Sequence, residues 1–309
     1  MTRRPPSRAR FAVSTVFFVN GVVLASWVPH VPAVNAHHGL RDGDLGIVLL
    51  SMAGAVLALP AAGWMVGRLG SRTMTAVAAV ALCLALPLPV LSPTVALLCL
   101  TLALLGACNG TLVPSRAAEG PLRRVLARPT RALLGLGVLA FLALLAEGAM
   151  ADWSAVYLRD TLRTGPAFAA AGFAAFSLAM AIGRLAGDGL ASRFGPGRVL
   201  RASGATAALG LGAALGIGQP AAGVVGCGMV GLGIANIIPL LFSGAGRVQG
   251  VQAGTALAAV ATTGYLGFLA GPPLIGLAAD AVGLPSALGI VSGCCALVAV
   301  GAGAVGGRS

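Results

Sequence analysis

The chain has 309 residues, of which 58% are hydrophobic and 9% charged, and its mean hydropathy is +0.95. About a quarter of the residues of an ordinary soluble protein are charged, so this composition excludes that class and predicts a membrane protein. The formal net charge is +12 and all 20 basic residues are arginines, which would suit a nucleic-acid-binding protein if they shared one soluble face. They instead form short clusters between apolar runs of about 20 residues, the length that spans a hydrocarbon core ~30 Å thick as a helix.

Ten apolar runs, separated by glycine, proline and charged residues, predict ten transmembrane helices. Their ranges are 11–34, 44–66, 73–91, 94–113, 132–157, 166–187, 199–217, 221–241, 255–278 and 284–305. A signal peptide is an alternative for the first run, because arginines precede it and Val34-Asn35-Ala36 loosely resembles a cleavage site. Its length and the nine runs that follow favour a transmembrane helix. The predicted fold class is therefore an all-α polytopic membrane protein.

The distribution of arginines predicts that both termini lie in the cytoplasm. When the ten helices are threaded alternately from a cytoplasmic N-terminus, sixteen arginines fall inside and only Arg41, Arg159 and Arg163 fall outside, as the positive-inside rule requires. The remaining one, Arg184, lies near the inner end of its helix. Because one missed helix would invert every later loop, this asymmetry favours a multi-pass protein of the cytoplasmic (inner) membrane.

Three pairs of similar segments, separated by 125 to 127 residues, predict an internal parallel repeat. The pairs centre on Trp27 and Trp153, Arg68 and Arg193, and Asn109 and Asn236. Helices one to four thus match helices five to eight, and the last two helices have no counterpart. The predicted domains are an N-terminal four-helix half (1–114), a cytoplasmic Arg-rich linker (115–131) and a C-terminal six-helix half (132–309). The two tryptophans close the outer ends of their helices, a position typical of aromatic belt anchors.

The loop after the second run resembles a loop of a known family. It reads Gly63-Trp64-Met65-Val66-Gly67-Arg68-Leu69-Gly70-Ser71-Arg72. This is similar to the G-x-x-x-D-R-x-G-x-R loop of the major facilitator superfamily (MFS) of secondary transporters, which is also built from parallel halves. Segments 147–154 and 263–273 resemble a poorly characterised bacterial branch related to the sugar-permease-like members. The loop aspartate is replaced by Gly67, and by Ser192 in the second half, so the capping charge of the family's gate is missing.

Members of this superfamily have two six-helix halves, and the resemblance implies that equivalents of helices five and six are missing here. In the family, helix five packs against helix eight, which corresponds to the 166–187 run. We therefore expect an opening beside that run, either sealed by a second copy in a homodimer or left open in a protein that transports poorly. The face expected to be exposed there carries Phe173, Phe176, Leu178, Met180 and Ile182.

Glu147 is the only carboxylate well inside an apolar run. A charge at the centre of a transmembrane helix costs roughly 2.5–3.5 kcal/mol on insertion scales and marks a functional site by default. We predict a substrate-linked or proton-linked role for Glu147; the alternative is a protonated or hydrogen-bonded glutamate that only packs helices. Asp152, five residues further along, is a second coupling candidate, although a polar group at a helix end is the favoured interpretation.

The other candidate residues are polar side chains in the expected cavity-lining helices: Asn20, Asn109, Asn236 and Tyr265. An amide in a membrane helix can bind a polar solute or join two helices through a hydrogen bond worth about 1 kcal/mol, and both interpretations remain open. By resemblance, the cytoplasmic gate is assigned to Gly63, Arg68, Gly70, Arg72, Arg193 and Gly195.

The sequence predicts a secondary active transporter that moves a small polar or amphipathic solute by alternating access, with proton coupling as one mechanism. The second hypothesis is a non-transporting truncated remnant or a membrane interaction protein. The six cysteines lie in apolar runs without metal-ligand spacing, and the sequence contains no Walker loop, catalytic triad or H-E-x-x-H motif. We therefore expect a solute, protons and the lipid bilayer as partners, and neither a metal, a cofactor, a nucleic-acid partner nor an enzymatic activity.

Overall fold

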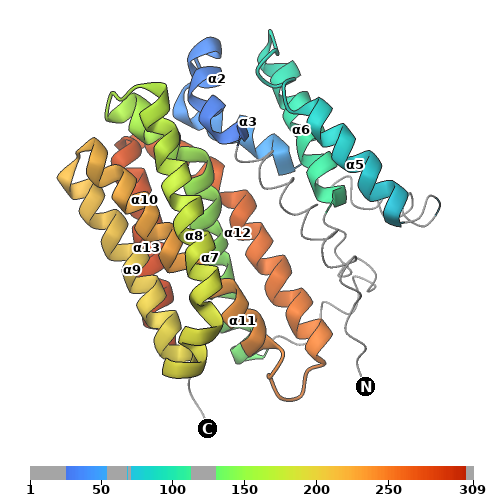
Figure 1. Cartoon of the computed structure of the whole chain (residues 1–309), viewed down its shortest axis with the longest axis vertical. Coiled ribbons are helices and arrows are strands. Elements are labelled where there is room, and N and C mark those ends of the chain that lie inside the picture. Colours follow the sequence, from blue (N-terminus) through green and yellow to red (C-terminus); the bar gives the residue numbers. More distant parts are fainter. Residues whose placement is uncertain (1–25, 54–67, 69–70, 113–129, 304–309) are drawn as a thin grey trace. The chain divides into compact units, whose positions relative to one another are not determined.

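The computed structural model describes residues 26–53, 68, 71–112 and 130–303, and these residues form helices joined by turns (Figure 1). The chain divides into two compact units. Unit 1 consists of Met1–His38 and Val48–Ala118, and unit 2 consists of Gly39–Ile47 and Glu119–Ser309. An all-helical architecture was the prediction, and the described residues contain no strand.

The described part of unit 1 consists of short helices and one helical hairpin. Its helices are η1 (Val28–His30), α2 (Val31–His38), the end of α3 (Asp42–Leu50), η2 (Ser51–Ala53), α5 (Ser71–Ala85) and α6 (Val95–Leu112). Leu82 and Leu105 form a buried core between α5 and α6. The run predicted as a helix over 73–91 ends earlier, at Ala85, because Pro87 and Pro89 follow and a proline disfavours helical backbone at the residue before it.

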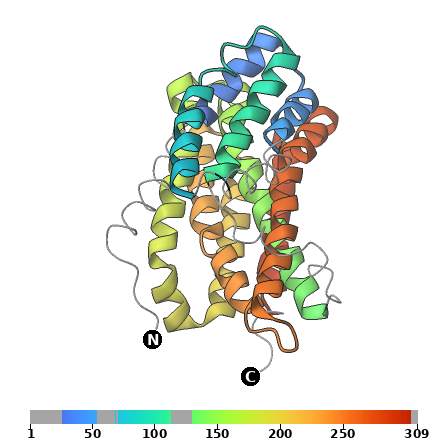
Figure 2. The same cartoon turned by 90° about the vertical axis from the view of Figure 1, so that its right-hand side faces the viewer.

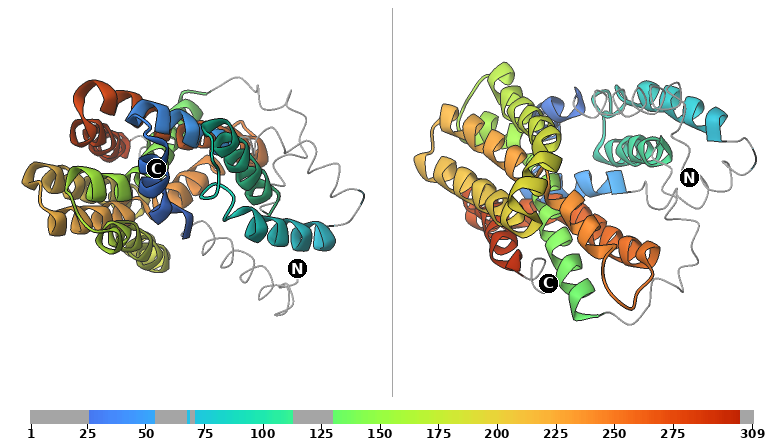
Figure 3. Two further views of the ribbon diagram at one scale, coloured as in Figure 1. Left: turned by 90° about the horizontal axis from the view of Figure 1, so that it is seen from above. Right: turned by 60° about the horizontal axis from the view of Figure 1, so that its bottom comes forward.

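Unit 2 contains six helices that are long and apolar enough to cross a membrane. They are α7 (Arg131–Val156) continued by η5 (Tyr157–Thr161), α8 (Pro166–Phe194), α9 (Pro196–Ile217), α10 (Pro220–Ile234) with α11 (Ile237–Ala245), α12 (Ala253–Val282) and α13 (Leu284–Gly301). They run side by side as a bundle (Figures 2 and 3) and correspond to the last six predicted spans. Much of the first two predicted spans lies outside the described residues, so the total of ten stays a prediction.

Proline, glycine and threonine set the ends of the long helices. The Thr130 side chain caps α7 by accepting a hydrogen bond from the Leu133 N–H at 3.3 Å. Gly195, at φ +83°, allows the sharp turn between α8 and α9, and Pro196 begins α9 at a position where its missing N–H costs nothing. The run predicted over 221–241 is interrupted by a turn that includes Asn236, which separates α10 from α11.

Helix α7 lies at the centre of unit 2 and contacts α8, α10, α11, α12 and α13. Its contact with α12 is a backbone-to-backbone approach made possible by three glycines on one face of α12. A methyl group on Gly267 would collide with the backbone of Phe141, and one on Gly271 would lie 2.8 Å from the Leu145 carbonyl oxygen. A methyl group on the third glycine, Gly264, would lie 2.8 Å from the side chain of Leu144 in α7. Small residues allow this close packing between membrane helices.

Trp153 joins α7 to the proline pair inside α12. Its indole N–H donates to the carbonyl oxygen of Pro272 at 3.2 Å, beside Pro273, where the chain lacks two consecutive N–H donors. In an α-helix those donors would serve the carbonyl oxygens of Phe268 and Leu269, four residues earlier, so the indole bond to Pro272 is an additional contact between α7 and α12 and not a replacement. The prediction of belt anchors is wrong for both tryptophans, because Trp153 is 0% and Trp27 3% exposed.

We expect Gly267→Ala to destabilise the protein and Gly293→Ala to be tolerated. The added methyl group meets Phe141 backbone at the first position and nothing within 4 Å at the second, on α13. Overpacking typically costs about 1–3 kcal/mol, whereas alanine at an exposed helical position gains up to about 1 kcal/mol over glycine. Thermal unfolding in detergent measures both variants. Equal midpoints would show that the α7–α12 approach does not limit stability.

Candidate functional site

Two charged side chains from consecutive helices meet at the edge of the bundle of unit 2. The Arg184 Nη2 atom of α8 lies 3.8 Å from the Glu147 Oε1 atom of α7. A short connection makes α7 and α8 antiparallel, and helical side chains lean toward the start of their own helix. Glu147 and Arg184 therefore reach toward each other. Their separation exceeds that of a direct hydrogen bond, so charge attraction holds the pair.

Arg184 and the exposed leucines occupy different faces of α8. At 100° per residue, Leu178 and Leu185 lie about 100–120° around the helix from Arg184, and their exposed fractions are 64% and 88%. Ile182, 54% exposed, lies about 160° away. Apolar side chains suit hydrocarbon, whereas a charged one is stable in the bundle interior or a water-filled cavity. Helix α8 therefore has an apolar face that suits lipid and, about 100–160° around its axis, the charged side chain of Arg184.

The face of α8 expected to be exposed is partly wrong. Leu178 and Ile182 are exposed as predicted, but Phe176 and Met180 are buried, with exposed fractions of 3% and 9%. The backbone of Phe176 lies against Gly231 of α10, because α8 turns this side toward α10. Phe173 is half-buried and stacks on the Phe176 ring with the ring centres 6.0 Å apart.

Asn236 connects the α10–α11 junction to α8. It is 7% exposed, and its Nδ2 atom donates a hydrogen bond to the Gly183 carbonyl oxygen at 2.8 Å. Gly187, one turn further along α8, leaves room for the amide oxygen, which any larger residue would meet. The amide thus joins the α10–α11 junction to α8. Because the bond ends on Gly183, it holds the α8 backbone in place directly before Arg184.

The remaining candidates do not gather around Glu147. Asp152 is half-buried on α7 and belongs to neither of the ion pairs found in the described part of the chain. Tyr265 is 61% exposed and lies about 100–160° around α12 from the glycines that face α7. Asn109 is on α6 in unit 1, where its Oδ1 atom is buried without a hydrogen-bond partner among the described residues. Asn20 lies outside the described residues.

The predicted gate residues are only partly described. Gly63 and Gly70 lie outside the described residues, Arg68 is exposed, and Arg72 lies in the first turn of α5. Arg193 belongs to the last turn of α8 rather than to a loop, because that helix continues to Phe194. Its guanidinium lies 5.3 Å from the centre of the Phe194 ring, within cation–π distance. Gly195 forms the turn that follows.

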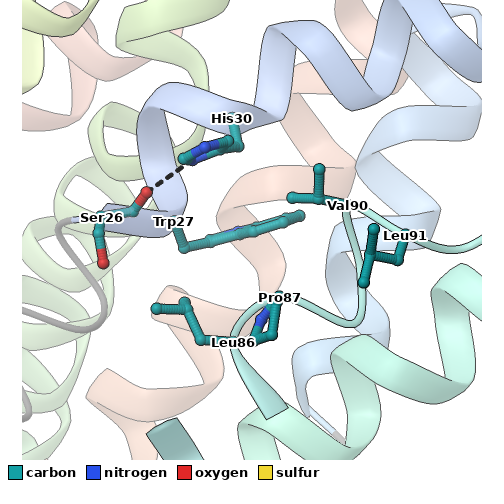
Figure 4. A pocket seen from close by; sticks show the side chains of 7 residues that line it. All are labelled: Ser26, Trp27, His30, Leu86, Pro87, Val90 and Leu91. Atoms are coloured by element: carbon teal, nitrogen blue, oxygen red, sulfur yellow. Dashed lines mark hydrogen bonds between the residues drawn. The ribbon is translucent and has the colours of Figure 1, made fainter. Parts of the chain in front are cut away.

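Unit 1 contains a mostly apolar cavity of about 290 Å³ (Figure 4). Its lining consists of Ser26, Trp27, His30, Leu86, Pro87, Val90 and Leu91. The His30 Nδ1 atom lies 2.8 Å from the Ser26 carbonyl oxygen, so this ring nitrogen is engaged by its own helix. Among the described residues that line it there is no acidic or arginine side chain, which makes it a poorer candidate for a polar solute than the charged pair of unit 2.

A second charged group joins the start of α3 to the end of α12 within unit 2. The Arg41 Nη2 atom lies 3.5 Å from the Asp280 Oδ2 atom, and Gly43 packs directly against Asp280. Burial raises the pKa of the Asp42 carboxyl, and the negative charges of Asp280 and Asp160 raise this pKa further. Sequence reasoning missed this cluster because more than 200 residues separate α3 from α12, and no local pattern signals their contact.

No protein-family profile matches the chain, but curated proteins do. An uncharacterised MFS-type transporter of Yersinia pestis is 30% identical, with 96% of this chain and 94% of that protein covered. The membrane protein MosC of Rhizobium meliloti is also 30% identical, with 90% and 85% covered. An uncharacterised transporter of Sinorhizobium fredii shows 30% identity as well, with 93% and 96% covered.

Solved structures with a similar fold include the fucose:proton symporter FucP of E. coli. One crystal structure, of a variant, matches with a TM-score of 0.51 and 19% identity over 94% of this chain and 91% of FucP. A second FucP structure, in the outward conformation, matches with a TM-score of 0.51 and 19% identity over 97% and 90%. At this identity the likeness concerns the fold alone.

We expect the contact between α3 and α12 to weaken as the pH rises. A raised pKa means that the protonated form of Asp42 is favoured in the folded contact, so its stabilisation is present at low pH and is lost as the pH rises through the raised pKa. Hydrogen exchange of residues 39–47, corrected for intrinsic rates, should speed up from weakly acidic to neutral pH. Asp42→Asn should abolish this dependence, and Asp44→Asn, an exposed neighbour, should preserve it. An unchanged dependence in Asp42→Asn would assign it to another group.

Proposed function

This chain belongs to the major facilitator superfamily of secondary transporters, and we propose that it moves a small polar or amphipathic solute across the cytoplasmic membrane by alternating access. Membership rests on the 30% identity to relatives over nearly the whole chain. The six apolar helices and the FucP-like fold agree with it. The relatives named for a function are transporters, in agreement with the prediction that the chain is not an enzyme.

The Glu147–Arg184 pair supports proton coupling and is the observation that carries this proposal. Protonation of Glu147 would cancel its charge and release Arg184, so proton occupancy would change the contact between α7 and α8. Ionisable groups within membrane helices mark proton and substrate pathways. The structural neighbour FucP is named a fucose:proton symporter. In this chain the Glu147 carboxylate is the group that would carry the proton.

The proposed topology has ten helices, in halves of four and six, with both termini in the cytoplasm. The alignment with the Yersinia relative runs over 365 residues, 56 more than the 309 of this chain. At least that many residues of the relative therefore lack a counterpart here. Two transmembrane helices with their turn need about this length, which supports the absence of helices five and six. The Arg-rich linker 115–131 is the proposed place of the gap.

The missing segment also favours a second candidate, a membrane interaction protein that no longer transports. In either case the exposed face of α8, which includes Leu178, Ile182 and Leu185, needs an apolar cover. Lipid supplies such a cover, and a second copy of the chain supplies it equally well. We propose a homodimer through this face as the arrangement that compensates for the missing helices.

We expect Glu147→Gln to abolish accumulation driven by a pH gradient while preserving exchange. Glutamine keeps the size of the side chain and removes the ionisable group, so substrate can still cross but a proton cannot drive it. Purified protein in liposomes is offered an equimolar panel of monocarboxylates, neutral sugars and primary amines, and the vesicle contents are identified by mass spectrometry. Asp44→Asn, which removes an exposed carboxylate, is the control. Unchanged accumulation in Glu147→Gln would exclude the role, and no accumulation by the wild type would favour the non-transporting protein.

We expect a cysteine at Leu185 to crosslink two copies of the chain. Leu185 is 88% exposed on α8, and Leu209, 71% exposed on α9, provides a matched control outside the proposed interface. Both substitutions are made in a background without native cysteines. A short bifunctional reagent should give a dimer with Leu185→Cys and none with Leu209→Cys. Monomers in both cases would exclude this interface.

A further inference from the structure

We propose that the Glu147–Arg184 pair binds the anionic group of the transported solute, so the solute is a small monocarboxylate carried together with one proton. The inference rests on the proposed transport function and gives its substrate class. It concerns a site formed entirely within unit 2, between α7 and α8.

The guanidinium of Arg184 is available to a ligand. Its side chain is 56% exposed, whereas that of Glu147 is 24% exposed, so the cation is the accessible member of the pair. Charge-assisted hydrogen bonds between such groups are about 2.7–2.9 Å long, but this pair is 3.8 Å apart. Arginine has five N–H donors in a planar fork that matches a carboxylate. The pair therefore leaves donors free for a second carboxylate.

A purely structural ion pair would have a different geometry. An ion pair that only joined the two helices would be expected to form a direct charge-assisted hydrogen bond, and the 3.8 Å separation is too long for one. The α8 backbone beside it is nevertheless fixed, because the Asn236 amide donates to the Gly183 carbonyl oxygen at 2.8 Å. The backbone at Arg184 is thus held in place while its guanidinium keeps N–H donors that Glu147 does not occupy. This is the arrangement expected of an arginine that binds a ligand.

The greater exposure of Arg184, and not the surrounding charges, favours an anion over a cation. In the described helices of unit 2, every arginine other than Arg184 lies within two turns of a helix end, and α10, α11 and α13 have no acidic or basic side chain. The acidic groups on the helices packed around the pair are Asp152 of α7, Asp160 of η5, Asp188 of α8 and Asp280 near the end of α12. An anion would find Arg184 as its partner, whereas a cation would have to approach Glu147 past this guanidinium.

The charge balance links solute binding to one proton. When a solute carboxylate binds Arg184, the Glu147 carboxylate loses its partner and would stay behind as an uncompensated charge, which is strongly unfavourable. Glu147 then takes one proton from hydronium on the side to which the site is open, leaving water. On the other side the solute departs, the proton returns to water, and Glu147 pairs with Arg184 again. The site is neutral both empty and loaded, so the carrier step moves no net charge.

The test uses the full chain in liposomes with an acidic exterior and an alkaline interior. The probes are lactate and gluconate, the neutral sugar glucose and the amine glucosamine, supplied together. We expect the carboxylates alone to accumulate, at a rate that does not change when a potassium gradient with valinomycin imposes a membrane potential. Accumulation of glucose or glucosamine without a carboxylate would overturn the substrate class and leave the transport function intact. No accumulation of any probe would overturn both.

Variants of the pair assign the result to Arg184. The double variant Glu147→Gln with Arg184→Gln leaves no unpaired charge and should fold; its carboxylate exchange should be about tenfold slower or worse than that of Glu147→Gln alone, the scale of a lost charge-assisted hydrogen bond. Arg184→Lys, with one point charge in place of the fork, should preserve part of the binding. Arg198→Gln, the same exchange at an exposed position of α9, should behave as the wild type. Carboxylate exchange in the double variant as fast as in Glu147→Gln alone would overturn the proposal.

Discussion

The close packing of α7 against α12 positions the charged pair, the buried tryptophan and the proline pair. Helices in lipid have no hydrophobic driving force toward each other, so van der Waals contact at short range must hold them. Gly267 and Gly271 allow that contact because they present backbone to backbone. Sliding or rotating α7 would separate these surfaces. Glu147 precedes Gly148, which itself lies against the Phe268 carbonyl of α12, so the same contact fixes its height and direction.

A second constraint is that polar groups among apolar helices need partners. Three of the polar interactions between helices of unit 2 are those of the Trp153 indole with the Pro272 carbonyl, the Asn236 amide with the Gly183 carbonyl, and Arg184 with Glu147. The first two end on backbone oxygens, which do not titrate, and so act as permanent connections. The third joins two ionisable side chains. Protonation can break it while the other two hold, so this contact is the one suited to switching between states.

The long helices of unit 2 could be predicted from the sequence, but the contacts between them could not. Hydropathy is a local property, and runs such as 132–157 and 284–305 indicated α7 and α13 directly. The rotation of each helix about its axis depends on partners far away in the chain. For this reason Phe176 was expected to be exposed and is buried, Trp153 was expected at the lipid interface and is buried, and Arg184 was not expected beside Glu147. Glu147 itself was identified because an isolated carboxylate in an apolar run is a local signal.

The rotation of α8 decides whether Arg184 is functional or merely costly. Leu185, its neighbour in the chain, lies 100° around the helix and is 88% exposed. A rotation by that angle would carry the guanidinium from its partly exposed position beside Glu147 to the middle of the apolar face, where a charge in contact with lipid is costly. The Asn236 hydrogen bond to Gly183 and the close approach of Phe176 to Gly231 oppose such a rotation. The small residues of α8 and α10 therefore do more than pack two helices: they hold an arginine at the edge of a lipid-facing surface, directed toward the carboxylate that can balance or release it.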